Sequence, residues 1–342
     1  MQKKYDAVII GAGPAGVSCA IWLKQFGFAP LLLEASDRVG GLSARNPFFD
    51  LWTPTVAGQT GIDIARGMAS QLEASGAEVW LNSPVERVTT QLKASAEQVA
   101  LVDKQSVATV QLAAQLAGPL VKQSKFLTQS VEQRRQNSIF IVSVLHKGQL
   151  IDIEARAVVI AAGVKARPLQ SGQDQSWPGI LVGPGEKIIQ QDFTGLSVAL
   201  LGGGDNAFEN YEYVKSRGAT QAHIYARSIR AQKQFVSRVN SSDVHVGAYD
   251  VEPNSRAVKG RVYDLIIVLY GWEAQAKFVE PLALKLNAKG FIATDHDTAQ
   301  TSQTGVYAIG EVSQRMHPCV VTAFADGVVA AKAIEAQLAE MY

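Results

Sequence analysis

The sequence predicts an α/β fold with two three-layer domains, the second inserted in the first. Two stretches, residues 7–25 and 196–215, each contain a short apolar run, a glycine-rich turn and then a helical pattern. A third stretch, residues 305–337, has an apolar run that ends in an acidic residue and is followed by a long helical pattern. A buried strand that enters a helix through a glycine turn is typical of Rossmann-like nucleotide-binding units. We therefore expect two Rossmann-like nucleotide-binding domains in one chain.

The positions of these stretches predict the domain ranges. Residues 1–168 plus 261–342 are expected to form the first domain, and residues 169–260 the second. Residues 91–136 are rich in Gln, Ala, Ser and Val and interrupt the first domain. We interpret them as an insertion, with either a structural or dimer-packing role or a role in docking a partner.

Composition narrows the function classes. With 342 residues, the chain is long enough for about two domains with cores of their own. Its formal net charge of +1 creates no field that would attract nucleic acid or an acidic membrane. Lys3 and Lys4 precede an apolar run, as in a signal peptide, but that run leads directly into the first glycine turn. We expect a cytoplasmic protein without a membrane span.

The chain contains two cysteines, Cys19 and Cys319. Because the sequence has no Cys-x-x-Cys pair and no zinc-ligand spacing, we expect neither a redox dithiol nor a metal site. Cys19 lies inside the first helical pattern and is expected to pack in the core.

The first glycine turn has the form Gly-x-Gly-x-x-Gly, from Gly11 to Gly16. Gly11 is expected to allow the tight turn, Gly13 to leave room for a pyrophosphate, and Gly16 to let strand and helix pack closely. N–H groups at the start of the following helix would then bind the phosphates. Glu34 ends the next apolar run, where an acidic residue can accept hydrogen bonds from ribose hydroxyls.

The residues that follow distinguish flavin from nicotinamide. Residues 37–42 read Asp-Arg-Val-Gly-Gly-Leu, which is similar to the Arg-x-Gly-Gly extension of FAD-binding flavoproteins. This similarity implies FAD as the first nucleotide. The aromatic-rich loop at 46–61 would either fold over a flavin or cap the sheet, and helical spacing predicts a helix at 61–75.

The middle of the chain is predicted to be mainly strands. Strands are expected at 78–81 and 85–89, and a hairpin at 138–155 turns around Lys147-Gly148. A separate strand is expected at 157–163, followed by a linker at 164–168.

The second glycine turn, Gly-x-Gly-x-x-Ala, runs from Gly202 to Ala207. The next predicted strand ends without an acidic residue and is followed by Arg227 and Arg230. Arginines at this place can pair with a 2′-phosphate, which favours NADPH over NADH. The alternative is that both are solvated surface residues. A strand at 264–270 is then expected to return the chain to the first domain.

With these motifs in order, the chain resembles low-molecular-weight thioredoxin reductases, the class II pyridine nucleotide-disulfide oxidoreductases. This group includes the ferredoxin/flavodoxin–NADP reductases of the same scaffold. The resemblance covers nearly the whole chain except the insertion. It implies a homodimer with FAD and NADPH, and hinges near Arg167-Pro168 and Arg261 about which the domains rotate. It also implies that the acid of Gly310-Glu311 binds the ribityl chain and that the helix from Val320 points its N-terminus at the flavin.

Three departures from this family qualify the resemblance. The region that corresponds to the family's Cys-x-x-Cys pair, 182–186, contains no cysteine, so electrons cannot pass through a dithiol there. The family's terminal Gly-Asp is Gly310-Glu311 here, and Tyr225-Ala226 stands where a His-Arg is expected. The last change thins the basic cluster for NADPH.

The motifs and the resemblance together predict the cofactor-binding residues. For FAD they are Gly11, Gly13, Pro14, Ala15, Gly16, Glu34, Ala35, Gly41, Leu42, Ala161, Ala162, Gly163, Gly310, Glu311, Pro318, Cys319 and Val320. For NADPH they are Gly202, Gly204, Asp205, Asn206, Ala207, Arg227 and Arg230.

Cys319 and His317 are weak candidates for catalytic residues. Cys319 lies at the predicted start of the terminal helix, where a helix N-terminus favours the thiolate form. The alternative is that Cys319 is a small residue whose backbone N–H binds the flavin edge. His317 could donate a proton or a hydrogen bond near the flavin.

These observations favour an FAD-dependent NAD(P)H oxidoreductase that passes electrons from the flavin directly to an external acceptor. That acceptor would be a ferredoxin or flavodoxin, a quinone or another small molecule. A second hypothesis keeps FAD but not NAD(P)H, so that a protein electron carrier reduces the flavin or the protein acts as a flavin-binding sensor. A flavin hydroxylase or oxidase is a third.

Overall fold

The computed structural model describes residues 4–92, 138–170 and 176–339, so the predicted insertion lies almost entirely outside the described residues. The chain forms two compact units. One contains Met1–Ala44, Asp63–Ala162 and Ala276–Tyr342, and the other contains Arg45–Ile62 and Gly163–Gln275. Each unit is built on its own largely or wholly parallel sheet, which confirms the predicted α/β class.

The first unit contains a seven-stranded sheet. In spatial order its strands are β3 (Glu78–Trp80), β2 (Pro30–Leu33), β1 (Lys4–Ile10), β6 (Gln149–Ile160), β5 (Ser138–His146) and β4 (Val85–Leu92), and β17 (Val306–Ala308) also pairs with β6. All pairs are parallel except those that β5 makes with β4 and β6. The strand order 3-2-1 is the one expected of a Rossmann-like unit.

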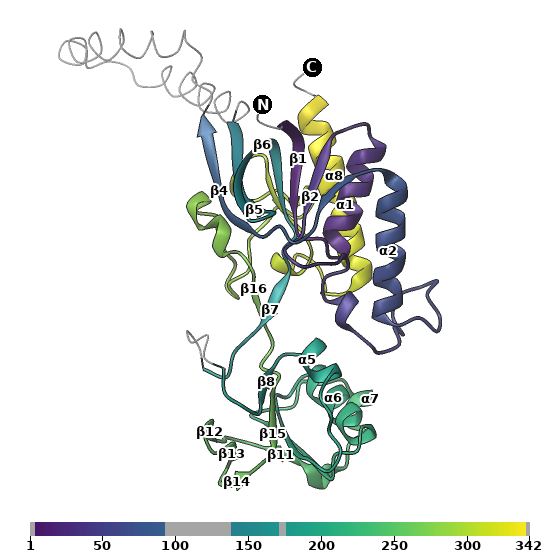
Figure 1. Cartoon of the computed structure of the whole chain (residues 1–342), viewed down its shortest axis with the longest axis vertical. Helices are drawn as coiled ribbons and strands as arrows, with labels where there is room; N and C mark the ends of the chain where they lie inside the picture. The colour runs from purple at the N-terminus through teal and green to yellow at the C-terminus, as the bar shows by residue number, and fades with distance from the viewer. Residues whose placement is uncertain (1–3, 93–137, 171–175, 340–342) are drawn as a thin grey trace, which may run out of the picture. The chain divides into compact units, whose positions relative to one another are not determined.

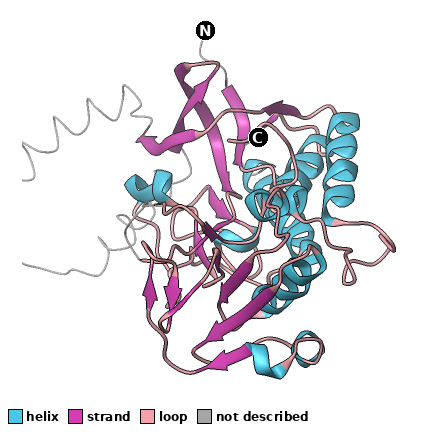
Figure 2. Ribbon diagram, turned by 60° about the horizontal axis from the view of Figure 1, so that its bottom comes forward, coloured by secondary structure: helices cyan, strands magenta, loops and turns pink. Residues whose placement is uncertain are grey.

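Three helices accompany this sheet: α1 (Pro14–Gln25), α2 (Gly61–Ser75) and α8 (Val320–Ala339). Figure 1 shows α1 and α8 side by side next to β1 and β2, and the turned view in Figure 2 agrees. Gly327 explains this close packing, because a Cβ there would lie 2.5 Å from the Ala15 carbonyl oxygen on α1. Strand β2 is buried along its whole length, as expected for parallel strands covered on both faces.

The second unit contains a five-stranded, fully parallel sheet. Its order is β11 (Val244–Val246), β10 (Gln221–Ala226), β9 (Ser197–Leu201), β15 (Leu265–Val268) and β8 (Ile180–Val182). The same unit holds α5 (Glu186–Ile189), α6 (Asp205–Ser216) and α7 (Lys233–Val236), and the antiparallel strands β12 (Val251–Glu252), β13 (Ala257–Val258) and β14 (Arg261–Val262). Alternate residues of β10 pack against α6 on one face of the sheet and against aromatic residues on the other.

Short 3₁₀ helices complete the described residues: η1 (Ser43–Arg45), η2 (Ser241–Asp243), η3 (Lys277–Leu282) and η4 (Gly310–Val312). No helix in the described parts of the chain is long and apolar enough to cross a membrane.

Several predictions about the middle of the chain were wrong. The strand expected at 264–270 in the first domain is β15, which pairs with β9 and β8 in the second sheet. The hairpin strand and the separate strand expected at 157–163 form one strand, β6, which continues through Arg156.

The two predicted linkers both contain short strands. The segment expected to be a linker at 164–168 contains β7 (Val164–Ala166), which pairs antiparallel with β16 (Trp272–Ala274). Arg261, predicted near a hinge, lies in β14 within the second unit. The long segment of the second unit, Gly163–Gln275, therefore begins with β7 and ends with β16, and these two strands pair.

Candidate functional site

The first glycine turn has the backbone form that a dinucleotide requires. Gly11 has a φ of +108°, and a Cβ there would lie 2.4 Å from the Ala161 carbonyl oxygen. A Cβ at Gly16 would lie 1.9 Å from the Gly11 carbonyl oxygen, so only glycine allows this strand and helix to pack together. At Gly13, by contrast, the nearest atom is 4.0 Å away, which leaves the position open. Gly13 makes no side-chain cap, so the first amides of α1 can bind an anion.

Glu34 closes this site from the end of β2. Its Oε2 accepts a hydrogen bond from the Ala12 N–H at 2.7 Å, and its Oε1 accepts from the N–H and hydroxyl of Ser36 at 2.9 and 2.7 Å. Gly41 lies against the turn, because a Cβ at Gly41 would be 3.0 Å from the Gly13 Cα. The predicted acid and the predicted Gly-Gly extension are thus both adjacent to the open glycine.

The terminal element reaches the same turn from the other side. Gly310 has a φ of +68°, and a Cβ there would lie 3.0 Å from the Ala15 Cβ. Burial raises the pKa of the Glu311 carboxyl, and among the described residues no hydrogen bond or ion pair is recorded for it. A carboxyl group can accept hydrogen bonds in either protonation state.

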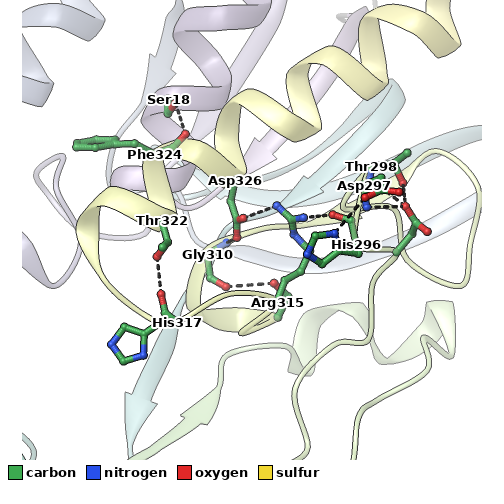
Figure 3. A network of polar contacts seen from close by, with 12 residues as sticks. Ser18, His296, Asp297, Thr298, Gly310, Arg315, His317, Thr322, Phe324 and Asp326 are labelled. Atoms are coloured by element: carbon green, nitrogen blue, oxygen red, sulfur yellow. Dashed lines mark hydrogen bonds and ion pairs between the residues drawn. The ribbon is translucent and has the colours of Figure 1, made fainter.

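Figure 3 shows how the start of α8 is held. The Cys319 N–H donates to the Thr322 hydroxyl at 3.2 Å, and that hydroxyl lies 2.6 Å from the His317 carbonyl oxygen. In this structure Thr322 accepts the hydrogen bond of the Cys319 N–H, and binding of the flavin edge by this N–H stays a prediction. Cys319 is partly exposed, whereas Cys19 is fully buried in α1 as predicted, and burial raises the pKa of the Cys19 thiol.

The other predicted FAD residues lie on the same elements. Pro14 opens α1, Ala161 follows β6 and is buried, Leu42 is partly exposed, and Val320 opens α8. The remaining predicted positions are Ala35 after β2, Ala162 and Gly163 after Ala161, and Pro318 before Cys319.

The second glycine turn repeats the geometry of the first. A Cβ at Gly202, whose φ is +149°, would lie 2.4 Å from the Leu269 carbonyl oxygen. Gly204 precedes α6 with no atom within 4 Å of its Cβ position, and Ala207 is fully buried. A tight first position and an open one at the helix start are the features of a nucleotide turn.

The side chains around this second turn are more acidic than we expected. A cavity of about 340 Å³ opens beside it and is lined in part by Asp205, Asn206, Glu209 and Arg230. Asp205 accepts hydrogen bonds from the backbone N–H and the side-chain amide of Gln232, at 2.7 and 3.0 Å. Burial, and secondly the charge of Asp205, raises the pKa of Glu209 to about 7. The sequence analysis missed Glu209, although its place on the helix after the turn was a usable signal.

The two predicted arginines lie in different surroundings. Arg230 lines the cavity, and its backbone N–H donates to the Gly203 carbonyl oxygen at 2.6 Å. Arg227 is close enough to Tyr249 and Tyr270 for its charge to oppose the rise that burial causes in their pKa values. Within the described ranges, neither guanidinium has a recorded hydrogen bond or ion pair, so both can pair with a ligand phosphate.

Tyr225, at the position where the resemblance leads us to expect a histidine, belongs to the core of the second unit. It is 4% exposed, and its hydroxyl lies 2.7 Å from that of Tyr263. Tyr225 is therefore part of a buried hydrogen-bonded pair and does not line the surface around the second turn. In the parts of the chain that the structure describes, no three His, Cys, Asp or Glu side chains are grouped as metal ligands.

The loop that follows the first nucleotide turn groups with the second unit. Its Asp50 accepts hydrogen bonds from the N–H groups of Trp52 and Thr53, and the Phe48 ring packs edge-to-face on Tyr213.

Comparison with known proteins agrees with this geometry. The sequence model of the family described as "Pyridine nucleotide-disulphide oxidoreductase" matches residues 5–327. The chain is 24% identical to the bifunctional thioredoxin reductase/thioredoxin of Mycobacterium leprae, over 98% of this chain and 66% of that protein. It is 22% identical to the ferredoxin–NADP reductase of Ignicoccus hospitalis, over 95% of both chains.

A solved structure shares the fold. The thioredoxin reductase of Lactococcus lactis, in its FR conformation, aligns with a TM-score of 0.71 at 20% identity. The alignment covers 98% of this chain and 99% of that one.

Proposed function

This chain belongs to the pyridine nucleotide-disulphide oxidoreductase family, and from that premise we propose that it is an NADPH-linked flavoenzyme that passes electrons from FAD directly to an external acceptor. One combination of features carries the proposal. The chain has two glycine turns of nucleotide-binding form, but its two cysteines are far apart in sequence and one is fully buried. A dithiol relay is therefore absent, and the electrons have to leave the flavin without one.

The first unit fits FAD. The open Gly13 position admits a pyrophosphate, and the uncapped N-terminus of α1 supplies amides and a positive dipole end for it. Glu34 is held by Ala12 and Ser36 where a ribose would lie, and the Glu311 carboxyl can hydrogen-bond a ribityl hydroxyl. FAD, when bound, supplies two-electron chemistry between a reduced nicotinamide and the acceptor.

The second unit fits a nicotinamide nucleotide that exchanges. Gly204 leaves the start of α6 open for a pyrophosphate, and Arg227 and Arg230 are available to pair with a 2′-phosphate. These cations support NADPH over NADH. The acidic pair Asp205 and Glu209 on the same cavity opposes tight binding of any anion.

The proposed acceptor is a ferredoxin or flavodoxin. Two observations support it: the missing dithiol, and the relative from Ignicoccus hospitalis that is named a ferredoxin–NADP reductase. The homodimer remains a prediction from the sequence resemblance, and the cytoplasmic location remains a prediction from the composition and the start of the sequence.

Anaerobic titration of the purified yellow protein tests the proposal. NADPH should bleach the visible flavin absorbance promptly and NADH should do so weakly, after which added ferredoxin or flavodoxin should restore it. Rapid oxygen uptake without an added acceptor would instead favour an oxidase.

A second candidate is an FAD protein that does not use NAD(P)H, and the acidic lining of the second cavity favours it. Bleaching by dithionite or a reduced ferredoxin, with none by NADPH, would support this candidate and contradict the first.

A further inference from the structure

A buried ion pair lies behind the turn that joins β17 to α8 (Figure 3). The Arg315 Nη2 lies 2.5 Å from the Asp326 Oδ1, and the two side chains are only 5% and 3% exposed. The other oxygen of Asp326 accepts a hydrogen bond from the Gly310 N–H at 2.9 Å. Arg315 also donates to the His296 carbonyl oxygen. One carboxylate on α8 thus connects this helix to the turn, and its cation connects both to the preceding loop.

Such a pair is a poor source of stability. Desolvation of two charges offsets much of their attraction, and the Arg315 Nε is buried with no partner among the described residues. A second ion pair of the same unit, Arg156–Asp6, is longer at 3.1 Å, and its side chains are 28% and 25% exposed. We therefore look for a role of this ion pair in the segments that it connects, and not in the free energy of unfolding.

Two glycines beside the ion pair, Gly310 and Gly327, contact Ala15 in the first glycine turn. Gly310, which donates to Asp326, approaches Ala15 so closely that a Cβ would lie 3.0 Å from the Ala15 Cβ. Gly327 follows Asp326 on α8 and packs closely against the backbone of Ala15 on α1. The Gly310–Glu311 turn therefore cannot move relative to α1 without disturbing the ion pair.

We propose that Arg315 and Asp326 are positioning residues of the FAD site, which hold the Gly310–Glu311 turn in its binding geometry and neutralise each other's charge beside it. This inference rests on the proposed function, in which the first unit binds FAD. A guanidinium stays protonated at any working pH. Removing only the carboxylate therefore leaves a buried positive charge, which favours the more electron-rich reduced state of the cofactor.

The test compares FAD affinity and flavin reduction potential in the full-length holoprotein. Asp326→Asn is expected to weaken FAD binding about tenfold and to raise the potential. A tenfold preference for the reduced state corresponds to about 30 mV for a two-electron couple. The double variant Arg315→Met/Asp326→Asn, which is neutral, should return the potential to the wild-type value while FAD binding stays weak.

Two further variants provide controls. Asp6→Asn breaks the more exposed pair with Arg156 and should change neither quantity. Arg315→Lys keeps the charge but loses the planar fork, so it should weaken FAD binding and leave the potential unchanged. If Asp326→Asn does not fold, Arg315→Lys still tests the positioning role.

The outcomes separate the inference from its premise. Equal potentials in Asp326→Asn and the double variant would overturn the neutralising role. If Arg315→Lys and Asp326→Asn bind FAD as tightly as Asp6→Asn does, the positioning role is overturned. A folded wild-type protein that binds no FAD would contradict the proposed function instead.

Discussion

Replacing Glu209 with glutamine is expected to remove most of the pH dependence of nicotinamide nucleotide binding. Glu209 lies on α6 and lines the cavity beside the second glycine turn, together with Asp205 and Arg230. Burial is the main reason that its pKa is raised to about 7, with a second contribution from Asp205 and an opposing one from Arg238. Glu212, on the same helix, adds a smaller contribution in the direction of Asp205.

The magnitude follows from this pKa. With a value of about 7, the carboxyl is about nine-tenths protonated at about pH 6 and about one-tenth protonated at about pH 8. An ionised Glu209 places a second negative charge beside Asp205 on the cavity that would receive an anionic nucleotide. If the neutral form alone binds well, the dissociation constant rises roughly tenfold between these pH values. Glu209→Gln should bind at high pH as tightly as the wild type does at low pH.

Calorimetric titration of the oxidised holoprotein measures these constants. NADH should be used beside NADPH, because a 2′-phosphate has its own pKa near 6 and would add a second pH dependence. Glu212→Gln is the matched control, because Glu212 lies on α6 but is not among the residues that line the cavity. Equal pH slopes for NADH in the wild type and in Glu209→Gln would refute the reasoning.

Three further predictions concern the nucleotide turns and the thiol. Arg227→Ala combined with Arg230→Ala should weaken NADPH binding by about tenfold or more and leave NADH binding unchanged, since charge-assisted phosphate bonds are lost; equal losses would reject the 2′-phosphate assignment. Gly16→Ala should destabilise the protein in urea by about 3 kcal/mol or more, because its Cβ would lie 1.9 Å from a backbone oxygen. Gly13→Ala should cost about 1 kcal/mol or less but release FAD, and the reverse pattern would contradict the roles given to these glycines. Cys319→Ser should keep electron transfer to the acceptor within about twofold of wild type in steady-state turnover, as expected without a dithiol; a loss of two orders of magnitude would show that the thiol takes part.

Local patterns predicted the parts of the fold that local interactions determine. The helix expected at 61–75 is α2, with the same limits, and the long terminal helix begins at Val320 as predicted. Both are marked by apolar residues at helical spacing, and α2 begins at a glycine while α8 begins two residues after a proline, signals that act within a few residues. The different steric roles of Gly11, Gly13 and Gly16 could likewise be read from the sequence, because a turn of this form constrains each glycine separately.

Pairing partners could not be predicted in the same way. The four residues of β15 are all buried, as in any strand covered on both faces, so their pattern is the same in either sheet. Arg315 lies in the loop before α8 and Asp326 lies within α8, and only the folded chain brings the two side chains together. Asp326 was still a visible signal, because it is a single charge within an apolar stretch of α8.

The two glycine turns share their backbone form, so any difference in how long they retain a nucleotide has to come from the side chains around them. At the first turn, the Glu34 carboxylate is held by Ala12 and Ser36 and faces no second acid in its recorded contacts. At the second, Asp205 and Glu209 share one cavity with Arg230, so the two carboxyl groups oppose the attraction of an anion to the guanidinium. An enzyme that keeps one redox cofactor and exchanges another needs this asymmetry. In the proposed function, the pH sensitivity would then fall on the exchanging nucleotide, because the pKa of Glu209 is raised to about 7.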